Sequence, residues 1–234
     1  MLILGIDTAT MQSGCAIGGH EGVLASTQCS RGRRHAENLA PAIEFVCEQS
    51  GIELKNIGVI AVDVGPGLFT GLRVGMATGR ALAHGLGIPM IGVPSLDLLA
   101  FAARLTPRLI GAVVDARRGE VYFSTYRQVP GGIQRIDEYS VGSPEEVASR
   151  FQAMRDEVLL VGDGARRYSE LFAENPKIEL ADPSLDYPSA ISLVQLAHAQ
   201  AMREEFLPLG EVEPMYLRRP DAEINWAVRD RSAS

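Results

Sequence analysis

Histidine and cysteine are scarce in this sequence, and their spacing excludes several kinds of site. The four histidines are His20, His35, His84 and His198. No two of them share a helical face at ligand spacing, which argues against a histidine-based zinc or iron site. The three cysteines, Cys15, Cys29 and Cys47, are odd in number and lack metal spacing, so reduced thiols in a cytosolic protein are expected.

Long apolar runs and excess positive charge are also missing. The first apolar run, residues 2–6, stops at Asp7 and is too short for a signal peptide or a membrane span. No later run is long enough either, so a cytoplasmic location is expected. The net charge of −7 argues against broad binding of a polyanion, which depends on Lys and Arg replacing counterions. Serine catalysis lacks support, because the chain has no Gly-x-Ser-x-Gly motif.

What remains is the pattern of a mixed α/β protein with enough residues for a substantial core. Apolar residues make up 46% of the 234 positions. The first half predicts strands at 2–6, 15–18, 23–28, 56–64 and 90–93, and helices at 36–50, 70–86 and 95–104, with Ser95 as a helix N-cap. The second half predicts strands at 109–114, 121–127, 133–141 and 158–161, and helices at 144–154 and 189–205. Asp115 follows its strand as Asp7 does, which suggests a divergent duplication.

A stripe of small residues is the most informative feature of the second predicted helix. Gly71, Gly75, Gly79 and Ala83 recur every four residues and share one face. Each interior glycine costs a helix about 0.5 to 1 kcal/mol relative to alanine, so a close neighbour should compensate. That neighbour is either the chain's own sheet or first helix, or a helix of another protein.

Two acids and a glycine turn are candidates for a nucleotide site. Gly65-Pro66-Gly67 precedes a helix and could hold phosphate, although it lacks the Lys-Ser or Lys-Thr pair of a P-loop and also fits a plain turn. Asp7, beside Thr8, and Asp115 could position a divalent ion. Each acid could equally accept loop N–H groups, and Arg117 and Arg118 could pair with Asp115.

Four segments of the sequence resemble the bacterial TsaB (YeaZ) family, which takes part in making threonylcarbamoyladenosine beside the anticodon of tRNA. They are Gly5-Ile6-Asp7-Thr8, His35-Ala36-Glu37-Asn38-Leu39, residues 65–73 (GPGLFTGLR) and residues 115–122 (DARRGEVY). The long glycine-rich segment is the most specific of them. One departure is Leu68, where the family more often has serine, and it weakens a phosphate role for that turn.

The resemblance implies an actin-like (ASKHA, ribonuclease-H-like) α/β fold of two lobes, built from tandem βββαβα halves with a reduced second half. The expected lobes are 1–105 and 106–220, with a flexible tail at 221–234. It also implies a paralogue, TsaD, that holds a catalytic metal through paired histidines. The corresponding segment here, residues 93–99, offers Ser95 and Asp97 but no histidine. We therefore expect a noncatalytic subunit with no catalytic residues, no bound metal and no cofactor.

In that family the first two helices contact partner subunits, which favours the intersubunit interpretation of the glycine stripe. The expected interface consists of His35, Glu37, Leu39, Phe69, Leu72, Arg73, Gly75, Met76, Gly79 and Ala83. Implied partners are a TsaD-type paralogue, a TsaE-type ATPase and a possible second copy, with tRNA reached mainly through the complex. The implied role is to activate TsaD in threonylcarbamoyl transfer to the tRNA adenosine. Alternatives are a sugar or acetate kinase of the same fold, which would turn over ATP alone, and a metallopeptidase, which lacks its ligands.

Overall fold

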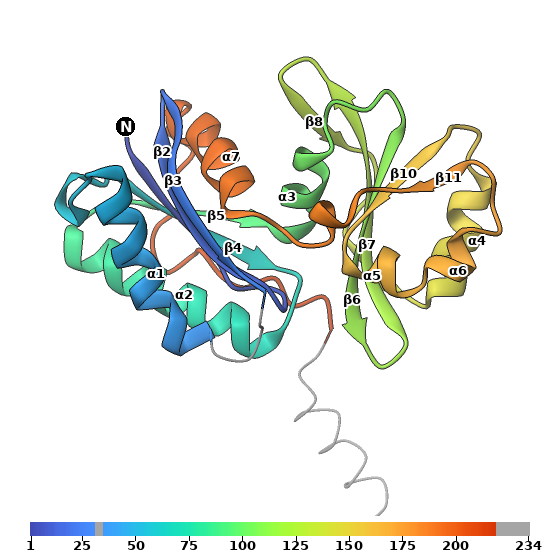
Figure 1. The fold of residues 1–234 in the computed structure, drawn as a ribbon, viewed down its shortest axis with the longest axis horizontal. Coiled ribbons are helices and arrows are strands. Elements are labelled where there is room, and N and C mark those ends of the chain that lie inside the picture. Colours follow the sequence, from blue (N-terminus) through green and yellow to red (C-terminus); the bar gives the residue numbers. More distant parts are fainter. Residues whose placement is uncertain (31–34, 219–234) are drawn as a thin grey trace, which may run out of the picture.

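The computed structural model describes residues 1–30 and 35–218, which form two lobes side by side (Figure 1). The first lobe contains a five-stranded sheet in the order β3-β2-β1-β4-β5. Its strands are β1 (Ile3–Asp7), β2 (Ser13–Gly19), β3 (Gly22–Cys29), β4 (Val59–Gly65) and β5 (Met90–Pro94). The first three strands are antiparallel, whereas β1, β4 and β5 run parallel, so the carboxyl ends of β1 and β4 meet at one edge.

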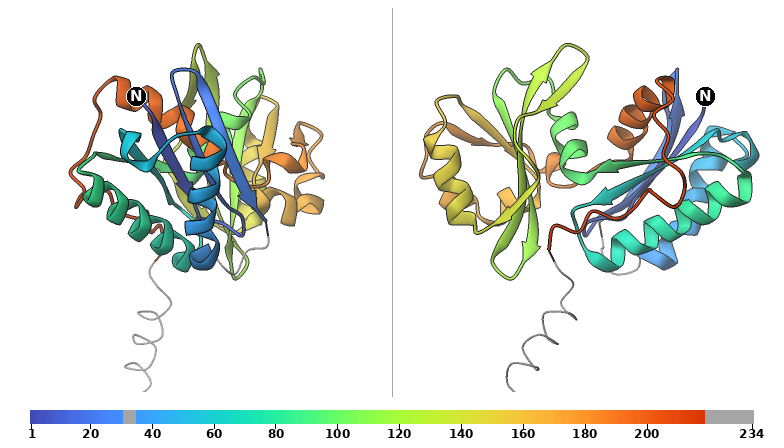
Figure 2. Two further views of the ribbon diagram at one scale, coloured as in Figure 1. Left: turned by 60° about the vertical axis from the view of Figure 1, so that its left-hand side comes forward. Right: turned by 180° about the vertical axis from the view of Figure 1, so that it is seen from behind.

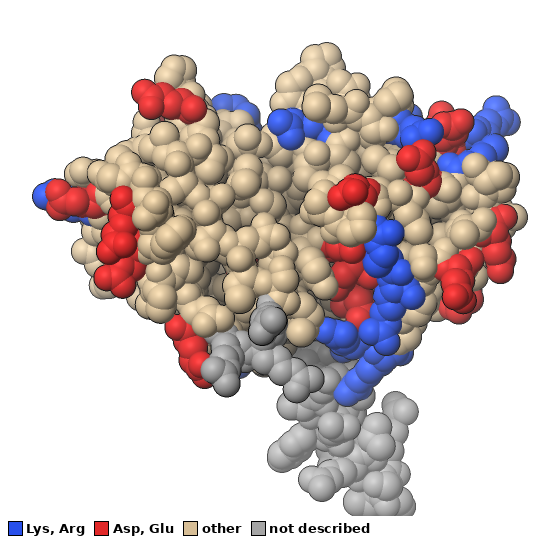
Figure 3. Space-filling view, viewed as in Figure 1, with Lys and Arg blue, Asp and Glu red and all other residues tan. Residues whose placement is uncertain are grey.

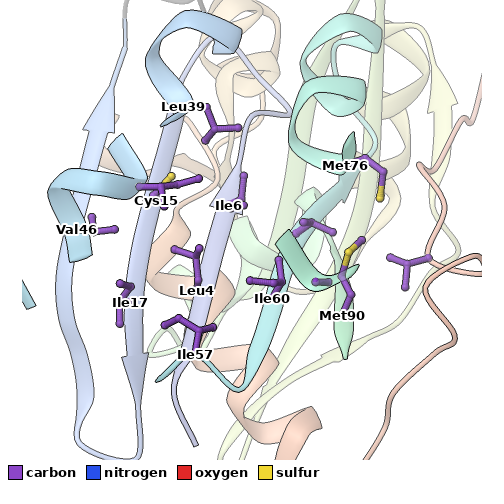
Figure 4. Close-up of a cluster of buried hydrophobic side chains, with 14 of the residues drawn as sticks. Leu4, Ile6, Cys15, Ile17, Leu39, Val46, Ile57, Ile60, Met76 and Met90 are labelled. Carbon is purple, nitrogen blue, oxygen red and sulfur yellow. The ribbon is translucent and has the colours of Figure 1, made fainter. Parts of the chain in front are cut away.

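Helices cover both faces of the first sheet. α1 (His35–Ser50) and α2 (Phe69–Leu86) lie on one face, where Leu4, Ile6 and Ile60 meet Leu39 and other apolar side chains (Figure 4). The opposite face is covered by α7 (Ala190–Met202), which comes from the far end of the chain. Burial of both faces explains why β1 and β4 are continuous apolar runs rather than alternating ones.

The second lobe is built on a six-stranded sheet in the order β11-β10-β6-β7-β8, with β9 also paired to β7. Its strands are β6 (Leu109–Arg117), β7 (Glu120–Val129), β8 (Gly132–Arg135), β9 (Ser140–Gly142), β10 (Val158–Val161) and β11 (Ile178–Leu180). α3 (Ser95–Ala102) packs on one face. α4 (Pro144–Ala153), α5 (Asp163–Arg167) and α6 (Ser169–Phe172) complete the lobe, and the short 3-10 helices η1 (Leu54–Asn56) and η2 (Pro183–Leu185) lie in connections.

The C-terminal part of the chain returns to the first lobe. After α7, residues 203–218 form an extended segment, here called the C-terminal strap, that runs past β5 and α2 toward the second lobe (Figure 2). Leu207 pairs with Met90 of β5, and the backbone N–H of Met215 donates to the carbonyl of Val64 over 2.7 Å. The division expected at residue 106 therefore needs correction, because α7 and most of the strap pack on the first lobe. The expected tail, residues 221–234, lies outside the described residues.

The predicted α/β class and most predicted elements are confirmed, but several local details differ. The strand expected at 56–64 begins only at Val59, and β11, α5 and α6 were not predicted. The single strand expected at 133–141 is split into β8 and β9. Ser95 is not an N-cap, because Pro94 occupies that position and the Ser95 hydroxyl donates to Asp63 instead. Across residues 1–30 and 35–218, we find no helix long and apolar enough to span a membrane.

Candidate functional site

Two fully buried carboxyl groups lie side by side at the edge where β1 and β4 end. Asp7 and Asp63 follow Ile6 and Val62, which are partners in the parallel register. Asp63 Oδ1 accepts from the Gly65 N–H over 2.8 Å and from the Ser95 hydroxyl over 2.6 Å. Asp7 Oδ1 accepts from the backbone N–H of Ala9, over 3.0 Å.

The second oxygens of these two carboxyls, both Oδ2, have no other hydrogen-bond partner among residues 1–30 and 35–218. Burial raises the pKa of Asp7 well above its usual range, and the charge of Asp63 raises it further. Burial also raises the pKa of Asp63, to about 6, although its hydroxyl and N–H donors oppose the shift. Since Asp63 has more donors, we infer that Asp7 holds the proton and donates to Asp63.

A third acid, the partly buried Asp97, binds α3 to the second lobe, and α3 itself packs against both sheets. Asp97 lies in the first turn of α3, and its Oδ1 accepts from the hydroxyls of Tyr126 (2.7 Å) and Tyr139 (2.9 Å), which belong to the second lobe. Ser95 is bound to Asp63 in the same way. The two polar residues that the sequence offered in place of metal-binding histidines are therefore both committed to internal hydrogen bonds.

The remaining nucleotide-site candidates are also engaged by the protein itself. The Thr8 hydroxyl donates to the carbonyl of Gly71 over 2.8 Å, and the Leu68 N–H donates to the carbonyl of Ala9 over 2.7 Å. Gly67 lies so close to Ala9 that an added Cβ would collide with that carbonyl oxygen. Gly65 has a φ of 96° and closes the turn before α2. Here the turn serves as a tight strand-to-helix connection.

Among the described residues, Asp7 and Asp115 line two different cavities. Asp7 lines a small hollow of about 10 Å³ with Gln12 and Ser189, enough for about one water molecule. Asp115 lies across the junction between the lobes, beside Asp163 and Leu68. The sequence allowed two possibilities for these acids, binding of a divalent ion or acceptance of backbone N–H groups. The structure shows the second: Asp7 accepts from the N–H of Ala9, and Asp115 accepts from the N–H of Arg117.

The glycine stripe of α2 faces the chain's own sheet, so its interpretation as an intersubunit surface is wrong. A Cβ on Gly71 or Gly75 would collide with Thr8, and one on Gly79 would lie 2.5 Å from Cγ1 of Val62. Gly71, Gly75, Gly79 and Ala83 are all buried. The close neighbour that the stripe requires is therefore strands β1 and β4.

Three other residues expected at the interface also belong to the core. Leu39, Leu72 and Met76 are each at most 4% exposed, so they cannot contact a partner directly. The remaining four are accessible to different extents. His35 is half-buried, and its Nε2 lies 2.9 Å from the carbonyl of Thr10. Glu37, Phe69 and Arg73 are exposed.

The outward face of α2 carries a second set of small residues, which are not part of the glycine stripe. Thr70, Ala77, Ala81 and Gly85 are exposed there, and Arg73 stacks on Phe69 at 3.9 Å from the ring centroid. Tyr216 of the C-terminal strap lies against the same ring, with centroids 5.5 Å apart. No sequence signal places Tyr216 here, because it depends on the path of the strap. Phe45 of α1 is exposed as well. It was not among the residues expected at the interface, because it lies outside the four segments that resemble the family.

In the second lobe, Asp115 accepts hydrogen bonds from two arginines that belong to different elements. Its Oδ2 accepts from Nη1 of Arg117 (3.0 Å) at the end of β6 and from Nη1 of Arg167 (3.2 Å) on α5. The expected pairing of Asp115 with Arg117 is confirmed, whereas no sequence signal indicated Arg167. Arg117, Arg118 and Gly119 have φ values of 65°, 56° and 78°, so three successive residues of this turn are left-handed.

Comparison with known proteins places this arrangement in a family. The model of the family "TsaD: tRNA N6-adenosine threonylcarbamoyltransferase" matches residues 23–226. The tRNA threonylcarbamoyladenosine biosynthesis protein TsaB of Escherichia coli is 33% identical over 221 residues, which cover 93% of this chain and 95% of that protein.

Solved structures give the same result for the fold. YeaZ from Pseudomonas aeruginosa superposes with a TM-score of 0.81 at 30% identity, covering 92% of this chain and 99% of that one. Component A of (R)-2-hydroxyglutaryl-CoA dehydratase from Acidaminococcus fermentans has a TM-score of 0.52 at 13% identity, covering 86% and 99% of the two chains, and shares the fold alone. The two-lobe architecture is the expected actin-like fold, and the chain belongs to the TsaB (YeaZ) family, with a role in the biosynthesis of threonylcarbamoyladenosine in tRNA.

Proposed function

We propose that this chain is a noncatalytic subunit that pairs with a TsaD-type paralogue in the cytoplasm and activates threonylcarbamoyl transfer to tRNA. The observation that carries the proposal is that the polar groups at the lobe junction are already hydrogen-bonded to one another. Asp63 binds Ser95, and Asp97 binds two tyrosines. Side chains bound in this way stabilise the junction of the lobes, and a substrate or metal would have to displace them.

The outward faces of α1 and α2 are the surface that this function would use. α1 exposes the acids Glu37, Glu44 and Glu48 beside Phe45, whereas α2 exposes Arg73 and His84 and no acid. The small side chains of α2 allow a partner helix to approach closely, and Phe69 supplies an aromatic anchor. In a second copy of this chain, the acidic α1 would face the basic α2, so a homodimer would compete for the same surface.

Ala81→Glu tests the surface without touching the core. Ala81 is exposed on the outward face of α2, so the chain should fold normally, while a new carboxylate would be buried unpaired beneath a partner helix. We expect the dissociation constant for the TsaD-type paralogue to rise by at least about tenfold. Ala199→Glu, at an exposed position of α7, is the matched control and should leave that constant unchanged. Analytical ultracentrifugation of the mixed subunits gives both values.

Reconstitution tests the role itself. tRNA modification by the TsaD-type paralogue with a TsaE-type ATPase should increase strongly when this chain is added. The Ala81→Glu variant should fail to stimulate at concentrations where Ala199→Glu does. Equal modification with and without the chain would refute the proposal, as would tRNA modification by this chain unaided.

A further inference from the structure

The turn between β6 and β7 joins two arginines on one buried carboxylate. Asp115 is only 4% exposed at its side chain, whereas Arg117 and Arg167 are 44% and 55% exposed. Both Nη1 groups donate to the same oxygen, Oδ2, and Oδ1 accepts the backbone N–H of Arg117 over 3.0 Å. The carboxylate thus fixes two guanidinium groups from β6 and α5 next to each other at the surface.

The N–H donors of this cluster outnumber the acceptors that the shared carboxylate offers them. One carboxylate carries a single negative charge, and each guanidinium carries a positive charge and five N–H donors. The other nearby acids have partners of their own, since Glu120 accepts from Arg218 and Asp186 from Arg166. Asp163 accepts the backbone N–H of Asp115, and burial raises its pKa to about 6. Asp163 is therefore largely ionised near pH 7 and faces the same arginines. What distinguishes this cluster is that two exposed guanidinium groups with spare N–H donors are held side by side on one buried carboxylate.

Other arginines in the described residues have a different ratio of acidic partners. Arg108 lies between two acids, Glu157 at 2.8 Å and Glu179 at 2.6 Å. Arg203 is bound by one acid, Glu205. A ratio of two arginines to one carboxylate is therefore a local feature of the Asp115 cluster. It is not a consequence of composition, because the chain as a whole is acidic.

The backbone at this turn adds an independent observation. Arg117 and Arg118 are two of three described non-glycine residues with positive φ, a conformation that is costly for L residues. It places the exposed Arg118 at the tip of the turn directly after Arg117. Figure 3 shows a band of basic side chains at this end of the second lobe, beside the junction. Strained backbone that presents adjacent arginines is typical of a binding site.

We propose that Arg117 and Arg167, held on Asp115, form a phosphate-binding site that takes a backbone phosphodiester of the tRNA substrate. Guanidinium groups bind phosphate oxygens through paired N–H donors, and the fixed pair is organised before the ligand arrives. Because the net charge of the chain opposes diffuse binding of RNA, a local site of this kind would matter most. The choice of RNA as the source of the phosphate rests on the proposed function.

The test measures tRNA binding by the assembled complex of this chain with its TsaD-type paralogue. An unmodified tRNA transcript is titrated at several salt concentrations against the complex with the wild-type chain and with Arg117→Gln/Arg167→Gln. We expect the double variant to bind about tenfold more weakly, and the slope of log Kd against log salt to decrease by about 1 to 2. Arg203→Gln is the control and should change neither value.

Removing both arginines could destabilise the turn by leaving Asp115 unpaired, so a second variant is needed. Arg117→Lys/Arg167→Lys keeps both charges but not the paired N–H donors, so it should restore the salt slope and only part of the affinity. Assembly with the paralogue is measured in the same samples, so that a failure of the proposed function is seen separately from a failure of this site. An unchanged Kd and slope in a folded, assembled Gln variant would overturn the proposal. Arg117- and Arg167-dependent thermal stabilisation by inorganic phosphate, with unchanged tRNA affinity, would overturn RNA as the source.

Discussion

At the scale of single residues, the pair of Asp7 and Asp63 combines full burial with the absence of a cation. Neither carboxyl has an arginine or lysine within ion-pair distance in the described residues. The other titratable groups that face the pair are Cys15 on β2 and Asp97 on α3, and neither supplies positive charge. Two ionised carboxylates in contact without compensation would be strongly unfavourable, so the folded protein retains a proton between them.

This retained proton predicts that stability falls as the pH rises. An aspartate in the unfolded chain loses its proton near pH 4, whereas the folded pair keeps one well above that pH. The folded state therefore binds more protons above pH 4, and the free energy of unfolding decreases until the folded pKa values are passed. The pair should account for a loss of about 1 to 3 kcal/mol between pH 4 and pH 8.

Asp7→Asn isolates the contribution of the pair. The amide cannot ionise and can still donate a hydrogen bond to Asp63, so the variant should lose part of the pH dependence and gain stability relative to wild type at pH 8. Urea unfolding at pH 4.5, 6 and 8 measures the difference. Asp156→Asn, at an exposed position, should run parallel to wild type. A constant difference between Asp7→Asn and wild type at every pH would contradict a shared proton.

At the scale of elements, α2 shows how much of the structure the sequence could predict. The glycine-rich turn before it led to a predicted helix at 70–86, and the helix spans Phe69–Leu86, so its limits were correct within one residue. The direction of its glycine stripe could not be predicted, since small residues line both faces. Gly75 faces β1, whereas a Cβ added to Gly85 would have nothing within 4 Å. Which small face is buried depends on the contacts of the sheet, and these are not local in sequence.

The same limit explains the errors at the candidate site. Ser95 has the residue type of an N-cap, but Asp63 is 32 positions away and its carboxylate is the stronger acceptor. The motifs predicted Asp7 and Asp115 as important positions. They could not show that Asp7 has a second carboxyl beside it, or that Arg167 joins Asp115 from 52 positions away. Such contacts follow from strand order and not from spacing.

Two glycine substitutions on α2 should have opposite effects on stability. A Cβ on Gly75 would collide with the hydroxyl of Thr8, so Gly75→Ala should destabilise the free chain by about 1 to 3 kcal/mol despite better helix propensity. Gly85→Ala meets nothing and should stabilise by about 0.5 to 1 kcal/mol. Thermal and urea unfolding of the isolated chain measure both. If Gly75→Ala were neutral alone and impaired only assembly, the stripe would be intersubunit after all.

At the scale of the whole molecule, the order of the chain and the division into lobes do not coincide. α7 lies beyond the second lobe in sequence, yet its Leu193, Val194 and Ala197 pack on the first sheet. The C-terminal strap then passes α2, where Arg80 donates to the carbonyl of Val212, and reaches the second lobe through Arg218 and Glu120. The first lobe is therefore completed by the last described part of the chain, and its stability depends on both ends of the sequence.

Leu193→Ala should loosen the first lobe and leave the second intact. Leu193 is fully buried against the sheet, and removal of its side chain should cost about 2 to 5 kcal/mol. Since local opening follows cooperative units of packing, amide hydrogen exchange should accelerate in β1 and β4, although they precede Leu193 by more than 100 residues in the sequence. Exchange in β7 and β10 of the second sheet should stay close to wild type.

Phe151→Ala provides the reciprocal experiment. Phe151 is 1% exposed and packs on the second sheet, where it lies close to Gly111 of β6. Its truncation should accelerate exchange in β6 and β10 and spare β1 and β4, because no described residue of the first sheet belongs to its apolar cluster. If both variants accelerated exchange equally in both sheets, the lobes would open as one unit and the strap would couple them fully. If Leu193→Ala accelerated exchange mainly in the second sheet, the assignment of α7 to the first lobe would be wrong.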